Sequence, residues 1–337
     1  MRRIYILITM LVCLCSCRYN DLCVEHPHGS LVVNVDWKEV PSNLKLPEGV
    51  RLSFYNTTTG EQHTTYRETF GGKVIVPDGE YNMLAYNSDT EMILFSGMDK
   101  FETAVAHLDE RSRAPFRNSP ASRAPSANGI YYDRISSNAN ERTRSEVTIG
   151  QPDRFFATYA VMRCMVTNNA NQSKDTMKVM PYSRVLFATV QVKVDGIKNI
   201  KECRASLSGV SRSLNLATGE PSEETGTVIF DLEQLDEHNL QQRVCMFGMK
   251  NSPDGTPTVE QIQHIVSLEF LLIDNSVITH EIDVSKSINF ETIAPEIEIP
   301  ILVEDIVIPD VEPPGGGFDA DLDDWDPEVV VPIKNQK

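Results

Sequence analysis

Several features that other classes of protein need are missing from this sequence. Basic residues are few, because 31 Lys and Arg stand against 48 Asp and Glu, which gives a formal net charge of −17. Nucleic-acid binding requires a basic surface against the phosphates, so this charge argues against that function. No apolar run approaches the roughly 20 residues that a helix needs to cross a bilayer. The sequence therefore predicts neither a nucleic-acid-binding protein nor a transmembrane helix.

Motifs for catalysis and cofactor binding are missing as well. The chain has no G-x-S-x-G elbow, no phosphate-binding G-x-x-x-x-G-K loop, no H-E-x-x-H zinc motif and no G-x-G-x-x-G turn. Asp319, Asp321 and Asp323 have the spacing that opens an EF-hand calcium loop. Asp324 and Val330 stand where that loop needs Gly and Glu. We therefore expect no enzyme, no cofactor and no metal site.

What is present begins with a signal for secretion. Met1–Arg3 is positively charged, and the eleven residues of 4–14 are apolar with a single exception. A run of this length is too short to span a membrane and is typical of the apolar part of a signal peptide. We expect residues 1–16 to be a signal peptide.

The end of this signal has the pattern of a bacterial lipoprotein. Leu14 stands three residues before Cys17, and the small residue Ser16 directly precedes it. This spacing predicts acylation of the Cys17 thiol, cleavage before Cys17, and an anchor of several acyl chains at about 0.8 kcal/mol per buried methylene. The sequence therefore predicts an outer-membrane lipoprotein anchored through Cys17. An ordinary secretory signal with an incidental cysteine is the alternative.

Four further cysteines remain after cleavage, namely Cys23, Cys164, Cys203 and Cys245. An exported protein can pair such cysteines, and four of them allow three full connectivities. No two have the spacing of metal ligands. We expect one disulfide or none, and the sequence does not determine which cysteines would pair.

Alternating apolar residues predict β-strands in the first half. Leu31, Val33, Val35 and Trp37 alternate with polar or exposed positions, and so do the apolar residues of 50–54 and 81–85. Period-two alternation between turns is typical of strands with one buried face. We expect a β-sandwich domain over residues 24–109.

The following segment has a different composition. Residues 110–146 hold seven Arg together with many Ser, Asn, Pro and Ala and few large apolar side chains. Such a segment buries too little surface to offset the entropy lost on ordering. We expect residues 110–150 to form a linker or a long exposed loop.

A second β region follows. Residues 186–194 alternate, and shorter runs over 205–209, 228–230, 244–247, 268–273 and 282–284 are further strand candidates. Residues 258–265 are the best candidate for a short helix. We expect a second β-sandwich domain over residues 151–312.

The tail is acidic and alternates in the same way. Residues 296–328 hold twelve Asp and Glu and no Lys or Arg, and a Pro-Pro-Gly-Gly-Gly break begins at Pro313. Beyond the break, Phe318, Ala320 and Leu322 alternate with three Asp, and Trp325 follows. We expect residues 313–337 to be a Gly-rich hinge and a terminal strand, which either completes the second domain or inserts into a neighbouring subunit.

These features together resemble the fimbrial proteins of Bacteroidales, the group of FimB-type anchors and FimA-type pilins. The resemblance is carried by the lipobox, by Val76-Pro77-Asp78-Gly79-Glu80-Tyr81 as a strand pair, by residues 205–209 with 216–219, and by the Gly-Gly-Gly-Phe-Asp-x-Asp-x-Asp-Asp-Trp tail. It implies an all-β protein of two transthyretin-like β-sandwich domains in tandem. It also implies a place among cell-surface fimbriae, as subunit or anchor, with other fimbrial subunits as partners.

One departure from the group bears on the role. Its polymerising pilins are trimmed by an Arg-specific protease near the first strand. In this chain the nearest Arg after Arg18 is Arg51, inside an expected strand. This favours a retained, lipid-anchored subunit that assembles by β-strand addition. The alternative is a surface lipoprotein that binds glycans or host ligands, although Trp37 and Trp325 both fall in strand patterns rather than on an aromatic platform.

Overall fold

The computed structural model describes residues 28–42, 44–111, 143, 145–158, 162–166, 176–250, 262–290, 293 and 298–313, with only the backbone of 162–166. Strands joined by turns make up most of this part, and a short 3-10 helix, η2 (Ile197–Asn199), lies among them. The expected all-β class is therefore confirmed. Within the described residues, no helix is both long and apolar enough to cross a membrane.

The first sheet combines strands from two separate parts of the chain. The earlier part contributes β1 (His28–Val35), β2 (Gly49–Asn56), β3 (Gln62–Glu68), β4 (Gly71–Pro77) and β5 (Gly79–Asn87). The later part contributes β9 (Phe156–Ala157), β10 (Met162–Val166), β11 (Thr176–Val179) and β12 (Tyr182–Ser183). Their order is β11-β1-β4-β3-β2-β5-β9-β12, and β10 also pairs with β5.

The alternation seen in the sequence produces the core of this sheet. The inward residues of β1, β2, β4 and β5 form one cluster, made mainly of Leu31, Val33, Val35, Val50, Leu52, Phe54, Val74, Val76, Tyr81, Met83 and Ala85. Each is at most 5% exposed. Trp37 joins them, and its indole nitrogen donates to the Thr69 carbonyl. The strands expected over 50–54 and 81–85 are thus present with the expected face buried, and the strand expected over 31–37 is present as far as Val35.

The remaining strands form three further sheets. A small sheet consists of β6 (Ile93–Ser96), β7 (Val105–Leu108) and β15 (Ser213–Asn215). A four-stranded sheet has the order β17 (Glu233–Gln234), β18 (Asn239–Met246), β13 (Leu186–Asp195), β21 (Ile299–Val307). A five-stranded sheet has the order β20 (Val277–Asp283), β19 (Ile265–Leu272), β14 (Ile200–Ser211), β16 (Thr225–Asp231), β8 (Val147–Ile149).

Strand pairing crosses the boundaries expected from the sequence. β9 to β12 lie beyond residue 150 yet pair within the first sheet, where β11 runs parallel to β1 and β10 antiparallel to β5. β6 and β7 lie before residue 109, yet β7 pairs with β15 on one side and with β6 on the other. β8 falls inside the expected linker of 110–150 and pairs with β16. A division of the chain into 24–109 and 151–312 therefore does not describe which strands pair.

Aromatic side chains join the first sheet to the sheets formed by later parts of the chain. The ring centroid of Tyr86 on β5 lies 4.9 Å from that of Phe95, and Phe155 lies 6.0 Å from each of them. Phe155 in turn lies 6.3 Å from Phe247, just after β18. Tyr55 contacts this cluster from β2, so β2 and β5 are buried on both faces. The sequence pattern predicted only one buried face for these strands, because the second face is covered by residues distant in sequence.

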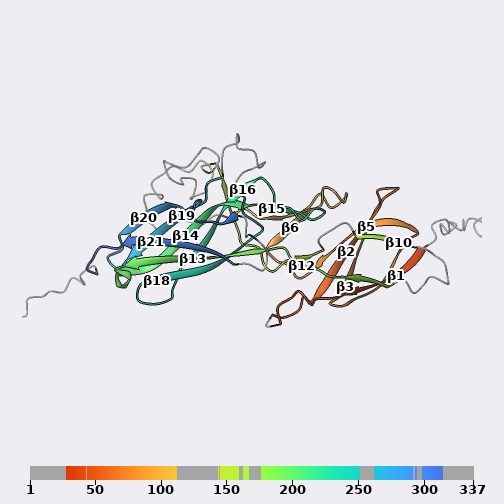
Figure 1. The fold of residues 1–337 in the computed structure, drawn as a ribbon, viewed down its shortest axis with the longest axis horizontal. Helices are drawn as coiled ribbons and strands as arrows, with labels where there is room; N and C mark the ends of the chain where they lie inside the picture. The colour runs from red at the N-terminus through yellow and green to blue at the C-terminus, as the bar shows by residue number, and fades with distance from the viewer. Residues whose placement is uncertain are drawn as a thin grey trace, which may run out of the picture.

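Figure 1 shows the resulting shape, with two lobes along one long axis. The N-terminal lobe holds β1 to β5 and β10, and the C-terminal lobe holds β13, β14 and β16 to β21. The described chain begins at the far end of the first lobe and ends at the far end of the second. The two chain ends therefore lie at opposite ends of the molecule.

The short helix expected over residues 258–265 is wrong where the structure describes it. Residues 262–264 are not helical, and Ile265 begins strand β19. Val266, Leu268 and Phe270 are at most 1% exposed and face the core. Period-two burial over β19 thus fixes an extended conformation, and residues 258–261 lie outside the described part.

Candidate functional site

The residues singled out from the sequence lie outside the described part of the chain. This applies to Cys17 and to the expected assembly strand with Phe318, Ala320, Leu322 and Trp325. The structure instead describes the two strands nearest to them, β1 at the start and β21 at the end. Their surroundings decide what each chain end can do.

β1 is enclosed on both sides. It pairs antiparallel with β4 over seven residues and parallel with β11 over four. Leu31, Val33 and Val35 are 4%, 0% and 5% exposed. At the turn into β4, Gly71 has a φ of +85°, and a Cβ there would stand 2.2 Å from the Val33 carbonyl oxygen. The first strand is therefore fixed in the interior of its sheet.

β21 is open on one side. It pairs parallel with β13 and, among the described residues, with no other strand. Ile299, Ile301 and Val303 face the core at 5%, 0% and 1% exposure, whereas Leu302 is 50% exposed. An edge strand of this kind presents backbone groups that an added strand can satisfy.

The free length of the β21 edge is limited at both ends. Pro300 has no amide hydrogen to offer to a partner strand near its start. Near its end, Asp305 has a φ of +64°, and the register against β13 shifts between Val192 and Val194. A bulge twists an edge away from a flat partner. An added strand would therefore pair mainly along residues 301–304.

Two other strands with a largely unpaired side, β20 and β4, are protected in other ways. β20 carries Glu281 and Asp283 on its exposed face, and charges on an edge strand oppose further pairing. β3 and β4 pair with each other only at Glu68 and Gly71, and the Arg67 guanidinium donates from Nε to the Lys73 carbonyl at 2.8 Å. Arg67 thus occupies an acceptor that a strand added to β4 would use.

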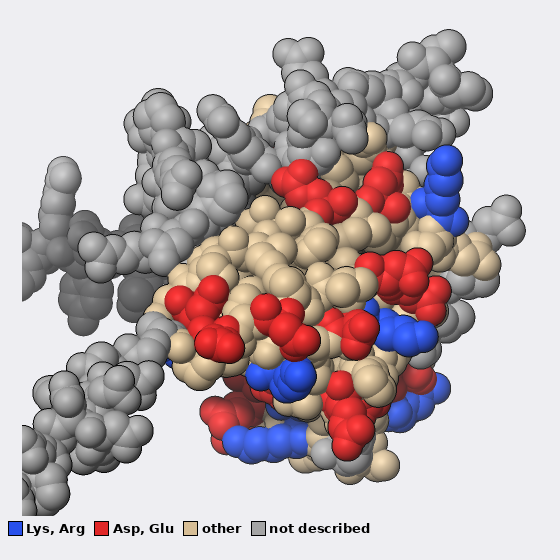
Figure 2. Space-filling view, turned by 90° about the vertical axis from the view of Figure 1, so that its left-hand side faces the viewer, with Lys and Arg blue, Asp and Glu red and all other residues tan. Residues whose placement is uncertain are grey.

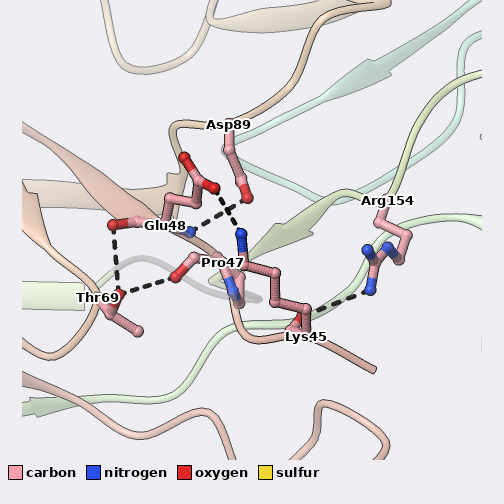
Figure 3. Close-up of polar contacts among 6 residues, drawn as sticks. All are labelled: Lys45, Pro47, Glu48, Thr69, Asp89 and Arg154. Atoms are coloured by element: carbon pink, nitrogen blue, oxygen red, sulfur yellow. Dashed lines mark hydrogen bonds and ion pairs between the residues drawn. The ribbon is translucent and has the colours of Figure 1, made fainter. Parts of the chain in front are cut away.

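A polar network at the junction of the lobes is structural. Figure 3 shows Lys45 paired with Glu48 at 2.6 Å, the Glu48 amide donating to Asp89, and Arg154 donating to the Lys45 carbonyl at 3.4 Å. Thr69 donates to the Pro47 carbonyl at 2.9 Å. These contacts hold the loop after Trp37 against the segment that returns from the C-terminal lobe to β9. The hollow among them has a volume of only about 130 Å³.

A buried carboxylate marks the place where the chain returns after the Arg-rich segment. Glu146 is 6% exposed and accepts hydrogen bonds from the Gly209 amide at 3.0 Å and from the Thr225 and Thr227 hydroxyls at 2.6 and 3.0 Å. Three donors supply the hydrogen bonds that a buried carboxylate requires. No local sequence pattern indicates this contact, because the partners of Glu146 are more than sixty residues away.

The described cysteines are not paired. Cys203 and Cys245 are both free thiols, and burial raises the pKa of each, that of Cys245 to about 12. Cys23 and the side chain of Cys164 lie outside the described part. Among the described residues no group of three or more His, Cys, Asp or Glu could hold a metal ion. Trp37 lies in the core, so it offers no surface for a glycan.

The fold and its open edge define an all-β protein with a strand available at the end opposite its N-terminus. The chain belongs to the family described as Domain of unknown function (DUF5119), whose model matches residues 16–231. It is 24% identical over 355 aligned positions to Fim4B of Bacteroides ovatus, a candidate fimbrium anchoring subunit, with 97% of each chain covered.

One solved structure supports the fold, and a second has a weaker likeness. A crystal structure of a candidate adhesin from Bacteroides ovatus superposes with a TM-score of 0.61 at 21% identity, over 89% of this chain and 99% of that one. The fimbrial anchor protein Mfa2 from Porphyromonas gingivalis gives a TM-score of 0.44 at 12% identity, over 81% and 90% of the two chains. The likeness to Fim4B over nearly the whole of both chains confirms the resemblance to Bacteroidales fimbrial proteins inferred from the sequence.

Proposed function

We propose that this chain is a structural protein of cell-surface fimbriae, held in the outer membrane by lipid on Cys17 and acting as their anchor or as a subunit. The relative Fim4B is named as a fimbrium anchoring subunit. It aligns with this chain over nearly the whole length of both, which supports this role. The names of the similar proteins are those of fimbrial and adhesion proteins rather than enzymes. The proposed partners are the membrane at one end and other fimbrial subunits at the other.

The observation that carries the proposal is the contrast between the chain ends. β1 begins ten residues after Arg18 and lies inside its sheet, so a lipid on Cys17 would be tethered to a firmly held strand. β21 ends at the far side of the molecule with one edge unpaired in the described part. Such a protein can be held at one end and bound at the other.

Assembly proceeds by β-strand addition in this proposal. The strand carrying Phe318, Ala320, Leu322 and Trp325 follows β21 after the Gly-rich hinge and pairs with a neighbouring subunit. Its apolar and acidic residues alternate, which suits a strand with one buried face. The β21 edge in turn has room for a strand along residues 301–304.

The experiment replaces the lipidated cysteine in cells that make the fimbriae. Cys17→Ala should abolish acyl labelling and move the protein out of the membrane fraction. Filaments should then appear in the medium if the protein is the anchor, or on cells in reduced number if it is a subunit. Cys23→Ala is the matched control and should keep both labelling and filaments. Unchanged labelling of Cys17→Ala would exclude the anchor at this residue.

A further inference from the structure

The far end of the C-terminal lobe contains a hollow of about 690 Å³ that the proposed function does not use. Three segments line it: the turn after β13, the loop before β18, and the chain that follows β21. Ile197, His238 and Pro309 represent the three segments. A hollow of this size is large enough for several side chains of a bound peptide.

Exposed aliphatic side chains flank the hollow. Val307 lines it and is 64% exposed, and Leu235, in the loop between the lining residues Gln234 and Glu237, is 57% exposed. An exposed aliphatic side chain in the wall of a hollow offers apolar contact to a ligand. The hollow can therefore receive apolar groups.

The rim of the hollow is acidic. Asp195, Glu237 and Asp310 line it, and Lys198 lies 3.3 Å from Asp310. Asp195 and Glu237 form no ion pair with any residue that the structure describes. Figure 2, which views the molecule from this end, shows more acidic than basic side chains on this face. A ligand that combines aliphatic groups with positive charge fits this surface.

We propose that residues 329–337 of the chain itself dock in this hollow. They comprise Val329-Val330-Val331-Pro332-Ile333 followed by Lys334 and Lys337, and no acidic residue follows Glu328. This aliphatic run with positive charges behind it matches exposed aliphatic side chains inside an acidic rim.

The length of the chain permits the docking. The described chain ends at Pro313, four residues after Pro309 in the wall of the hollow. Residues 314–328 then span up to about 50 Å when extended, at roughly 3.3 Å per residue. The segment can therefore turn back to the hollow without strain. When residues 329–337 are docked, the strand with Phe318 and Trp325 is held at both of its ends and stays close to β21. This consequence alone depends on the proposed function.

The test uses the soluble mature chain truncated after Glu328 and a fluorescein-labelled peptide of residues 329–337, followed by fluorescence anisotropy. The truncated protein should bind the peptide saturably. The full-length protein should bind it at least tenfold more weakly, because its own segment occupies the site. Higher salt should weaken binding, because the rim contributes through charge.

Variants locate the site. Val307→Ser or Leu235→Ser in the truncated protein should reduce affinity at least fivefold, and so should Glu237→Lys. Ile75→Ser is the matched control, because Ile75 is an aliphatic residue with 61% exposure on the other lobe, and its affinity should not change. All of these side chains are exposed, so folding should be retained, as circular dichroism would verify.

Two results would overturn the proposal. One is the absence of saturable binding, or equal binding by all variants. The other is self-association of the full-length protein that is disrupted by the peptide. This result would mean that the segment docks in a second copy. The assay contains no membrane and no other subunit, so its failure would leave the role of Cys17 untouched.

Discussion

The first and last strands of the described chain share a pattern of burial but differ in their surroundings. In β1 and β21 buried residues alternate with more exposed ones, and both strands have a parallel neighbour. β1 has a second partner in β4, whereas β21 has none in the described part. Alternation thus predicts which face of a strand is buried, and the number of neighbours decides whether the strand is a fixed element or a surface for assembly.

A matched pair of valines tests this difference most strongly. Val33→Ser on β1 should lower the free energy of unfolding by about 2–5 kcal/mol, because it leaves a cavity and a buried hydroxyl. Val307→Ser at the end of β21, where the side chain is 64% exposed, should change it by less than about 0.5 kcal/mol. Denaturant unfolding of both variants gives the comparison. Equal losses would mean that the end of β21 is as enclosed as β1.

A matched pair of glycines tests the turn that fixes β1. Gly71→Ala places a Cβ against the Val33 carbonyl in addition to the strain of a positive φ, so we expect a loss of about 2–5 kcal/mol. Gly60 has a similar φ of +75° but open space around it, and Gly60→Ala should cost only about 1 kcal/mol. Thermal unfolding separates the two. A larger loss at Gly60 would contradict the close approach of β4 to β1.

The lobes should also differ in their response to acid. His264 in the C-terminal lobe is 0% exposed, and burial is the main cause that lowers its pKa below the ordinary 6.5, while contacts with the Ser208 and Lys250 carbonyls act in the opposite direction. The unfolded chain then takes up a proton near pH 6.5, before the folded protein does. Stability should therefore fall as the pH decreases below about 6.5.

Hydrogen exchange between pH 8 and about 5.5 would follow this loss in each lobe separately. We expect β19, which begins next to His264, to lose protection in acid before β1 does. His264→Gln should reduce the pH dependence of the C-terminal lobe. A pH dependence that is unchanged in this variant would assign it to other groups.

The smallest effect is expected from cutting the chain between the two parts of the first sheet. Trypsin should cut first between Arg111 and Arg144, because Arg184 is 4% exposed and Arg51 lies half-buried among aromatic rings. The nicked protein should still elute as one species, since β9 to β12 remain paired with the strands before the cut. Separation of the fragments without denaturant would contradict this pairing.

Much of the fold could be predicted from the sequence, and the reason is visible in particular strands. β1, β2, β5 and β13 are eight to ten residues long and contain alternating runs of apolar residues, and their expected buried faces are buried. The return of β9 to β12 to the first sheet could not be predicted. These strands have two to five residues, too few for a period, and their partners lie far away in the sequence.

The candidate site was predictable only in part. The lipobox around Cys17 and the alternating tail are local patterns, so the sequence displays them directly, and both remain predictions outside the described residues. The open edge of β21 depends on the order of strands in its sheet, which no local pattern contains. The hollow near Val307 likewise arises from three segments that meet only in the folded chain.

The central claim is that one end of this protein is held in the membrane and the other binds the next subunit. The most direct measurement is to count surface filaments on cells whose protein is truncated after Pro313 and keeps Cys17. We expect the truncated protein to remain folded and acylated in the membrane fraction, while the cells lose their attached filaments. Filaments at the normal number on these cells would contradict the claim.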